Sequence, residues 1–181
     1  DRISYSCYRI VMCKNELKQS DSELVSCAEE GAKSQNYHPA IFCLSKLAVY
    51  YNDIAKDYWK SMNYSVARIE MAIRRLNGEG LSQTDIFMFK NNPSYAQSER
   101  NNCLQAIAWS CYSMSLCHRN IGNLEYCEKH LLQKSLDLYE KSGIKVDPTG
   151  YICKRLDEIG LTIIPNKTKP YRRVMELIEN I

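Results

Sequence analysis

The sequence contains few residues that interrupt regular secondary structure. Seven glycines and five prolines occur in 181 residues, which favours long helices over turn-rich β structure. No apolar run approaches the roughly 20 residues that a membrane-spanning helix needs, and the first residues lack the pattern of a signal peptide. We therefore expect no membrane partner for this chain.

The signatures of common enzyme families are missing as well. The sequence has no GxxxxGK[ST] loop, no GxGxxG, no GxSxG, no HExxH and no CxxC pair. Cys117 and His118 are neighbours on an expected helix and point in different directions, whereas Cys127 and His130 are three residues apart and can touch. We interpret Cys127 as a residue of the hairpin core and His130 as a residue on the flank of that core. The sequence therefore predicts no enzyme, no metal site and no cofactor.

Charge of one sign is not in excess either. Lys and Arg number 24 against 21 Asp and Glu, a formal net charge of +3, which by itself predicts neither a nucleic-acid nor a membrane partner. Hydrophobic residues make up 45% of the chain, and the length suits a single packed domain over 1–181. Because the chain starts at Asp1 rather than Met, it can be a fragment of a longer protein.

Cysteine, by contrast, is abundant. The nine cysteines are an odd number, whereas a secreted disulfide framework usually pairs an even number in a smaller chain. In a reducing compartment a buried thiol acts as a small hydrophobic residue. We therefore predict an intracellular protein of the cytoplasm or nucleus. The cysteines at apolar positions of helical patterns are Cys27, Cys43, Cys111, Cys117 and Cys127.

A long hairpin over 95–142 is the strongest pattern in the chain. Its two arms carry apolar or small residues at steps of three and four, separated by Asn-Ile-Gly-Asn at 120–123. Such steps place these residues on one helix face, and Gly and Asn suit a tight turn. We therefore predict two antiparallel helices. Their facing residues are Ile107, Cys111, Met114 and Cys117, then Leu124, Cys127, Leu131 and Leu138.

The N-terminal part, 1–80, follows the same periodicity. Its third helix is expected to be unusually long, because neither Gly nor Pro breaks the pattern after Pro39. The N-terminal helices are predicted at 2–18, 22–35, 39–62 and 64–77.

Residues 81–95 and the C-terminal part, 150–181, are less regular. Phe87 and Phe89 either pack on the core from a short helix and loop, or belong to an exposed aromatic docking loop. In the C-terminal part, β-branched residues before a proline predict extended chain at 161–165, between capping helices at 150–159 and 169–180. The predicted fold is all-α, with about seven helices.

Three segments of the chain align on Tyr37, Tyr64 and Leu124. Small residues lie nine positions before and three positions after each anchor, and larger ones seven positions after it. This pattern resembles the tetratricopeptide repeat, in which small residues let the two helices of a hairpin approach closely. Gly122, before Leu124, makes the central hairpin the best match. The aligned residues are Ala28, Ala55 and Ser115, then Ala40, Ala67 and Cys127, then Leu44, Met71 and Leu131.

The resemblance implies a fold and a function. The fold would be antiparallel hairpins stacked as a short superhelix or bundle. The function would be that of a scaffold or adaptor that binds a peptide or helix of a partner protein. The alternative is a nucleic-acid-binding domain that uses basic patches, which predicts affinity that falls steeply with salt.

Aromatic and basic side chains supply the candidate binding residues. Tyrosines outnumber phenylalanines by 13 to 3, and amphipathic rings suit contact surfaces. Basic residues suit an acidic partner. The aromatic candidates are Tyr50, Tyr51, Tyr58 and Trp59. The basic group on the helix at 64–77 is Arg68, Arg74 and Arg75. The C-terminal group is Lys169, Tyr171, Arg172 and Arg173.

Overall fold

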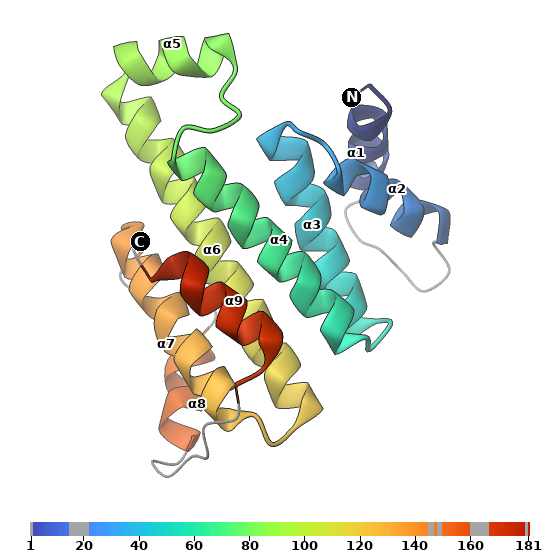
Figure 1. Cartoon of the computed structure of the whole chain (residues 1–181), viewed down its shortest axis with the longest axis vertical. Coiled ribbons are helices and arrows are strands. Elements are labelled where there is room, and N and C mark those ends of the chain that lie inside the picture. Colours follow the sequence, from blue (N-terminus) through green and yellow to red (C-terminus); the bar gives the residue numbers. More distant parts are fainter. Residues whose placement is uncertain (1, 15–21, 145–146, 148–149, 160–166, 180) are drawn as a thin grey trace.

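The computed structural model describes residues 2–14, 22–144, 147, 150–159, 167–179 and 181, and every regular element in these ranges is an α-helix (Figure 1). The predicted all-α class is therefore confirmed. Nine helices occur in these ranges, where the sequence predicts about seven. They are α1 (Arg2–Lys14), α2 (Ser22–Ala32), α3 (Tyr37–Asp53), α4 (Tyr58–Leu76), α5 (Gln83–Asn91), α6 (Pro93–Ile121), α7 (Glu125–Lys141), α8 (Ile152–Glu158) and α9 (Lys169–Ile178).

The long helices pack in chain order. α1 lies against α2, α2 against α3, α3 against α4, α4 against α6 and α6 against α7. Helices one step further apart also touch, since α3 contacts both α1 and α6. The last helix, α9, turns back and lies against α4 (Figure 1). Across the ranges described above, no helix combines the length and the apolar character needed to cross a bilayer.

The main hydrophobic core lies where α4, α6 and α7 meet. Ile69, Ile107 and Leu131 are fully buried there, and Ile152 of α8 and Val174 of α9 close it. A second, smaller core joins α1, α2 and α3. The 29-residue α6 therefore has neighbours on several sides, which is why it buries Cys, Ser and Met side chains as well as aliphatic ones.

The central hairpin is confirmed. α6 ends at Ile121 and α7 begins at Glu125. Gly122 and Asn123 both have positive φ values, 84° and 54°, in a region that Gly and Asn adopt more readily than other residues. Across the hairpin, the Ser135 hydroxyl donates a hydrogen bond of 2.9 Å to the Ala108 carbonyl. The small side chain of Ser135 permits this close approach.

The predicted long helix at 39–62 is wrong. α3 ends at Asp53, and α4 begins at Tyr58 rather than near residue 64. Lys56 takes a positive φ of 57°, and the Asp57 carboxylate accepts a hydrogen bond from the Lys60 backbone N–H at the start of α4. Asp57 therefore marks the start of a new helix, α4, in a segment where neither Gly nor Pro signals the break after α3.

The second copy of the predicted repeat is also wrong. Ala55 is exposed in the turn between α3 and α4, and Tyr64 lies inside α4 rather than at the start of a helix. Ala55 and Ala67 therefore do not face each other across a hairpin. In the first and third copies, the anchors Tyr37 and Leu124 do lie at the starts of α3 and α7.

The remaining elements agree with the sequence in part. α2 ends at Ala32, before the predicted end at 35, and α5 shows that most of 81–95 is helical. Phe89 is half-buried against Tyr95, whereas Phe87 is 64% exposed, so only one of the two phenylalanines packs inward. The predicted extended segment at 161–165 and the end of the first helix, at 15–18, lie outside the described residues.

The approach of α2 to α3 depends on Gly31. An ideal Cβ at this position would lie 2.5 Å from Cys43 Sγ and 3.5 Å from the Tyr8 backbone nitrogen. We expect Gly31→Ala to lower the free energy of unfolding by about 1–3 kcal/mol, the usual cost of overpacking a core. Urea unfolding curves measure this change. The double variant Gly31→Ala/Cys43→Ala should recover most of the loss, and equal losses in the single and double variants would contradict this account.

Candidate functional site

The basic side chain of Arg68 lies in a surface groove, and no carboxylate of the described residues pairs with it. The groove has a volume of about 510 Å³, within the usual range for ligand sites. α6 contributes the largest share of its lining, α3, α4 and α7 contribute further residues, and Ile144 lies just after α7. We call it the Arg68 groove, and its lining residues are Tyr37, His38, Ile41, Arg68, Asn102, Gln105, Ala106, Trp109, Tyr139 and Ile144.

The guanidinium of Arg68 is poorly compensated. Among the described residues, its side chain donates to the Ser110 hydroxyl at 3.5 Å, and its Nε–H is sealed from solvent with no acceptor there. Burial lowers the pKa of Arg68 to about 10, so the side chain is still charged at neutral pH. Arg68 is half-buried, and a cation that is partly removed from water without a carboxylate beside it is poorly compensated. The groove therefore holds a charge that a bound anion would compensate.

The rest of the groove is rich in hydrogen-bond donors. Burial raises the pKa of Tyr139 to about 12 and also raises that of Tyr37, so both phenols keep their protons. Tyr37 Oη lies 3.4 Å from Cys103 Sγ, within hydrogen-bond distance. Gln105 and Trp109 add an amide and an indole N–H. None of the described residues that line the groove carries a carboxylate, so the groove suits a ligand that supplies acceptors.

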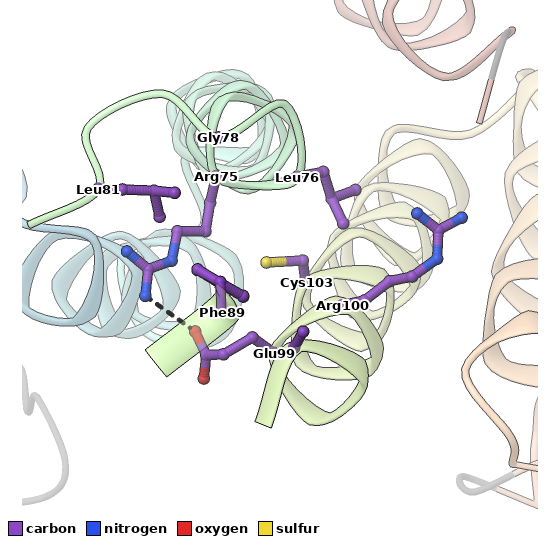
Figure 2. A pocket seen from close by; sticks show the side chains of 9 residues that line it. Arg75, Leu76, Gly78, Leu81, Phe89, Glu99, Arg100 and Cys103 are labelled. Atoms are coloured by element: carbon purple, nitrogen blue, oxygen red, sulfur yellow. Dashed lines mark hydrogen bonds and ion pairs between the residues drawn. The ribbon is translucent and has the colours of Figure 1, made fainter. Parts of the chain in front are cut away.

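The structure separates Arg68 from the two arginines predicted to act with it. Arg74 is exposed and pairs with Glu79 at 3.2 Å. Arg75 is buried and donates to Asp85 at 2.9 and 3.0 Å and to Glu99 at 3.1 Å (Figure 2 draws the pair with Glu99). These hydrogen bonds hold the pKa of Asp85 well below its ordinary value, against a smaller opposing effect of burial. Arg75 therefore stabilises the junction of α4, α5 and α6 and is not presented at the surface.

The C-terminal basic group on α9 is also divided. Lys169 and Arg172 are exposed, and Arg173 pairs with Glu70 of α4 at 2.7 Å. Tyr171 is buried, and its hydroxyl lies 3.2 Å from His130 Nδ1. Tyr171 and Arg173 therefore hold α9 on α4 and α7. Lys169 and Arg172 face solvent, and so does the Arg173 side chain, which is 51% exposed beside Glu70.

The aromatic candidates lie on both sides of the turn between α3 and α4. Tyr51 is buried: its hydroxyl donates to Glu29 at 3.1 Å and accepts from Lys60 at 2.6 Å. Tyr50 packs edge-to-face on Tyr51. The ring of Trp59 is 50% exposed. A further candidate, Tyr58, is half-buried against the main core. Of the four, Trp59 is the one that offers a large ring to solvent.

The histidines and thiols considered for chemistry take part in packing. His118 is fully buried, and its Nδ1–H donates to the Met114 carbonyl at 2.7 Å, which leaves Nε2 to accept from the Thr168 hydroxyl at 2.8 Å. Burial raises the pKa of Cys127, so its thiol stays protonated. No disulfide joins the cysteines that the structure describes. Nor do three His, Cys, Asp or Glu side chains of the described ranges gather as metal ligands would.

Buried histidines make stability depend on pH. Burial lowers the pKa of His118 and, with nearby lysines, that of His130. The unfolded chain therefore binds protons below about pH 6.5 that the folded chain does not. Stability should be complete above that pH and should fall by up to about 1.4 kcal/mol per pH unit per histidine below it. Urea unfolding at several pH values measures the slope.

Two variants test which histidines cause this change of the unfolding free energy with pH. His130→Gln should roughly halve it, because one of the two histidines with a lowered pKa is removed. His38→Gln, which changes an exposed residue, should leave it unchanged. A slope that is the same in all three proteins would contradict the assignment.

Sequence reasoning found Arg68 but missed most of the groove. From the sequence, Tyr37 is an anchor of the aligned segments, and Trp109 and Tyr139 are only members of the hairpin at 95–142. These residues are far apart in sequence and meet only because α3, α6 and α7 lie side by side.

No protein-family model, no curated protein and no solved structure matches this chain.

Proposed function

We propose that the protein is a protein-interaction module of stacked helices that binds an acidic peptide segment of a partner protein in the Arg68 groove. The observation that carries the proposal is the charged Arg68 side chain, which lies in a donor-lined groove to which the described residues contribute no carboxylate. A peptide carboxylate would meet the guanidinium in a bidentate pair. The amides and phenols of the groove would donate to the carbonyls of the peptide.

The order of helix packing supports the tetratricopeptide-like part of the proposal. In such arrays each helix contacts its chain neighbours, and the first helices of successive hairpins also touch. Here α1 with α2, α3 with α4, and α6 with α7 form hairpins, and α3 contacts both α1 and α6. The Arg68 groove draws most of its lining from α3 and α6, the first helices of two successive hairpins.

The module works inside the cell, in the cytoplasm or nucleus. The observation that supports this location is the burial of cysteine side chains. The fully buried cysteines of the helical cores include Cys43, Cys111, Cys117 and Cys127. Buried thiols of this kind are typical of proteins in reducing compartments.

Selection from a random peptide library displayed on phage tests the proposed function. Peptides selected on the wild-type protein should share an Asp or Glu flanked by apolar residues. Fluorescence anisotropy on a selected peptide should show about a tenfold or greater loss of affinity in Arg68→Met, the size expected when a buried charge pair is lost. Equal affinity in the two proteins, or no enrichment of acidic residues, would overturn the proposal.

The same binding experiment distinguishes an acidic-peptide ligand from the alternative ligand, a nucleic acid. An acidic peptide held by one arginine should show a shallow dependence on salt, whereas binding through several phosphates falls steeply. Poly-uridylate is a suitable competitor, and its displacement of the peptide together with a steep salt slope would favour nucleic acid. Arg172→Met, on the exposed face of α9, is the matched control and should bind the peptide as the wild type does.

Arg68 should also carry a cost in stability. Arg68→Met keeps the length of the side chain and removes a half-buried charge that no described carboxylate compensates, so the free energy of unfolding should rise by up to about 1 kcal/mol. Urea unfolding of Arg68→Met and Arg172→Met measures the difference. A loss of stability in Arg68→Met alone would mean that the guanidinium has a structural role.

A further inference from the structure

A second surface groove lies on the N-terminal hairpin of α1 and α2, the blue helices of Figure 1, and its lining contains two cysteines. Its volume is about 540 Å³, and it shares no lining residue with the Arg68 groove. Cys7 of α1 and Cys27 of α2 are both half-buried, so a small molecule in the groove can reach them. We call it the thiol groove, and its lining includes Ile3, Cys7, Cys27, Glu29, Glu30 and Lys33.

The two cysteines of the thiol groove are in direct contact. A hydrogen bond joins the Cys7 thiol to the Cys27 thiol, because α1 packs against α2 in the first hairpin of the fold. A disulfide bond is about 2.05 Å long, and side chains can rotate between staggered positions. Sulfur atoms that already touch therefore have only a short distance to close before they can form a bond.

A third thiol lies close to this pair but is enclosed. Cys43 of α3 has no exposed surface, and an ideal Cβ at Gly31 would lie 2.5 Å from its Sγ. Burial raises the pKa of Cys43 to about 12, and the neighbouring Cys7 and Cys27 add to this effect. Cys43 therefore stays protonated and out of contact with solvent, which leaves Cys7 and Cys27 as the accessible pair.

The charges around the pair favour an uncharged reactant. Glu30 pairs with Lys33 at 2.8 Å, and Glu29 pairs with Lys60 at 3.3 Å. The described lining thus contributes two carboxylates and one ammonium group, which disfavours an anionic oxidant such as glutathione disulfide. Hydrogen peroxide is small and uncharged, so it meets no such repulsion in the groove.

We propose that Cys7 and Cys27 form a redox-sensitive pair, which hydrogen peroxide converts to a disulfide that joins α1 to α2. The thiolate of one cysteine attacks the peroxide, the O–O bond breaks, hydroxide leaves and takes up a proton, and the sulfur becomes a sulfenic acid. The thiol of the other cysteine then attacks that sulfur. The S–S bond forms, and the sulfenic oxygen leaves as water with the proton of the attacking thiol.

The overall reaction transfers two electrons. Two thiols are oxidised to one disulfide, and one hydrogen peroxide is reduced to two waters. Two molecules of a cellular thiol such as glutathione reverse the change by exchange and become a disulfide themselves. Disulfides of reducing compartments are usually transient and redox-sensing. The inference does not depend on the proposed peptide binding, because the two grooves have no residue in common.

Peptide mapping by mass spectrometry tests the proposal on the whole chain. The protein is treated with hydrogen peroxide, its remaining thiols are blocked with iodoacetamide, and the monomer is digested with trypsin without reduction. Trypsin places the cysteines of this region on separate peptides, which are 3–9 with Cys7, 10–14 with Cys13, 19–33 with Cys27 and 34–46 with Cys43.

The expected product is peptide 3–9 joined to peptide 19–33. Its mass should be that of the two peptides less two hydrogens, and reduction with dithiothreitol should separate them. Glutathione disulfide at the same concentration should give less of this product. No joined peptide, or a main product that joins any other pair, would overturn the proposal.

The melting temperature provides the second test. A disulfide restricts the unfolded chain, so the peroxide-treated protein should melt about 5–10 °C higher than the reduced protein. Cys7→Ser should show no such shift. Cys153→Ser, which removes an exposed thiol of α8, is the matched control and should keep the shift. If Cys7→Ser fails to fold, Cys27→Ser removes the same bond. A shift that survives in the folded variant, or no shift in the joined wild type, would overturn the proposal.

Discussion

Replacing Arg75 with alanine should lower the free energy of unfolding by about 3–5 kcal/mol, the cost of breaking a buried ion pair from one side. The substitution leaves the carboxylates of Asp85 and Glu99 close together with no cation between them. The Glu99 side chain is 9% exposed and that of Asp85 is 20% exposed, so water compensates them poorly. Unfolding in urea, followed by circular dichroism, measures the loss.

The neighbouring arginine provides the control for this result. Arg74→Ala removes the same side chain one position earlier on α4, where the pair with Glu79 is 60% and 55% exposed. Its cost should stay below about 1 kcal/mol, as for other surface ion pairs. The double variant Arg75→Ala/Glu99→Gln should recover part of the loss. Equal losses in Arg74→Ala and Arg75→Ala would contradict a buried pair.

The contribution of the Arg75–Asp85 pair to stability depends on pH, in the direction set by the pKa shift of Asp85. Because the pKa of Asp85 is lowered in the folded state, the unfolded chain takes up a proton at this position first as the pH falls. The contribution of the pair is therefore complete above about pH 4 and is lost below it.

Replacing Arg155 with alanine should cost a similar amount, about 3–5 kcal/mol at neutral pH. Glu128 lies in the first turn of α7 with its side chain 2% exposed. Arg155 of α8 donates to both of its carboxylate oxygens, at 2.6 and 3.0 Å. Without the guanidinium, a buried carboxylate is left with no cation beside it, and the contact between α7 and α8 loses its polar link.

Urea unfolding at neutral pH measures the loss in Arg155→Ala. Lys154→Ala, at the exposed neighbouring position, is the control and should change little. Equal losses in the two variants would contradict the role assigned to Glu128.

The fold class could be predicted because its signals are local. Apolar residues at steps of three and four on both arms of 95–142, and Gly and Asn in the turn, act within a few residues of one another. The same reasoning failed at 54–57, where apolar residues continue the helical spacing through a turn. Asp57 was the available signal there, since an N-capping side chain marks the start of a new helix and therefore a break in the pattern before it.

The candidate site could be predicted only in part. Arg68, Arg74 and Arg75 look alike in the sequence, three arginines on one amphipathic helix. In the described part of the structure, no carboxylate pairs with Arg68 in its groove, Arg74 pairs with Glu79 at the surface, and Arg75 is enclosed by two carboxylates. Glu99 and Asp85 come from different helices, so no spacing rule connects them to Arg75.

The sequence by itself determined that the chain is helical and that residues 95–142 fold back as a hairpin, because helix periodicity and turn chemistry depend on neighbours along the chain. The tertiary structure decided which charged side chains are compensated inside the fold and which lie open in a groove or at the surface. The physical reason is that burial and ion pairing depend on which helices meet, and α4 meets α5, α6 and α9 through contacts between residues distant in sequence.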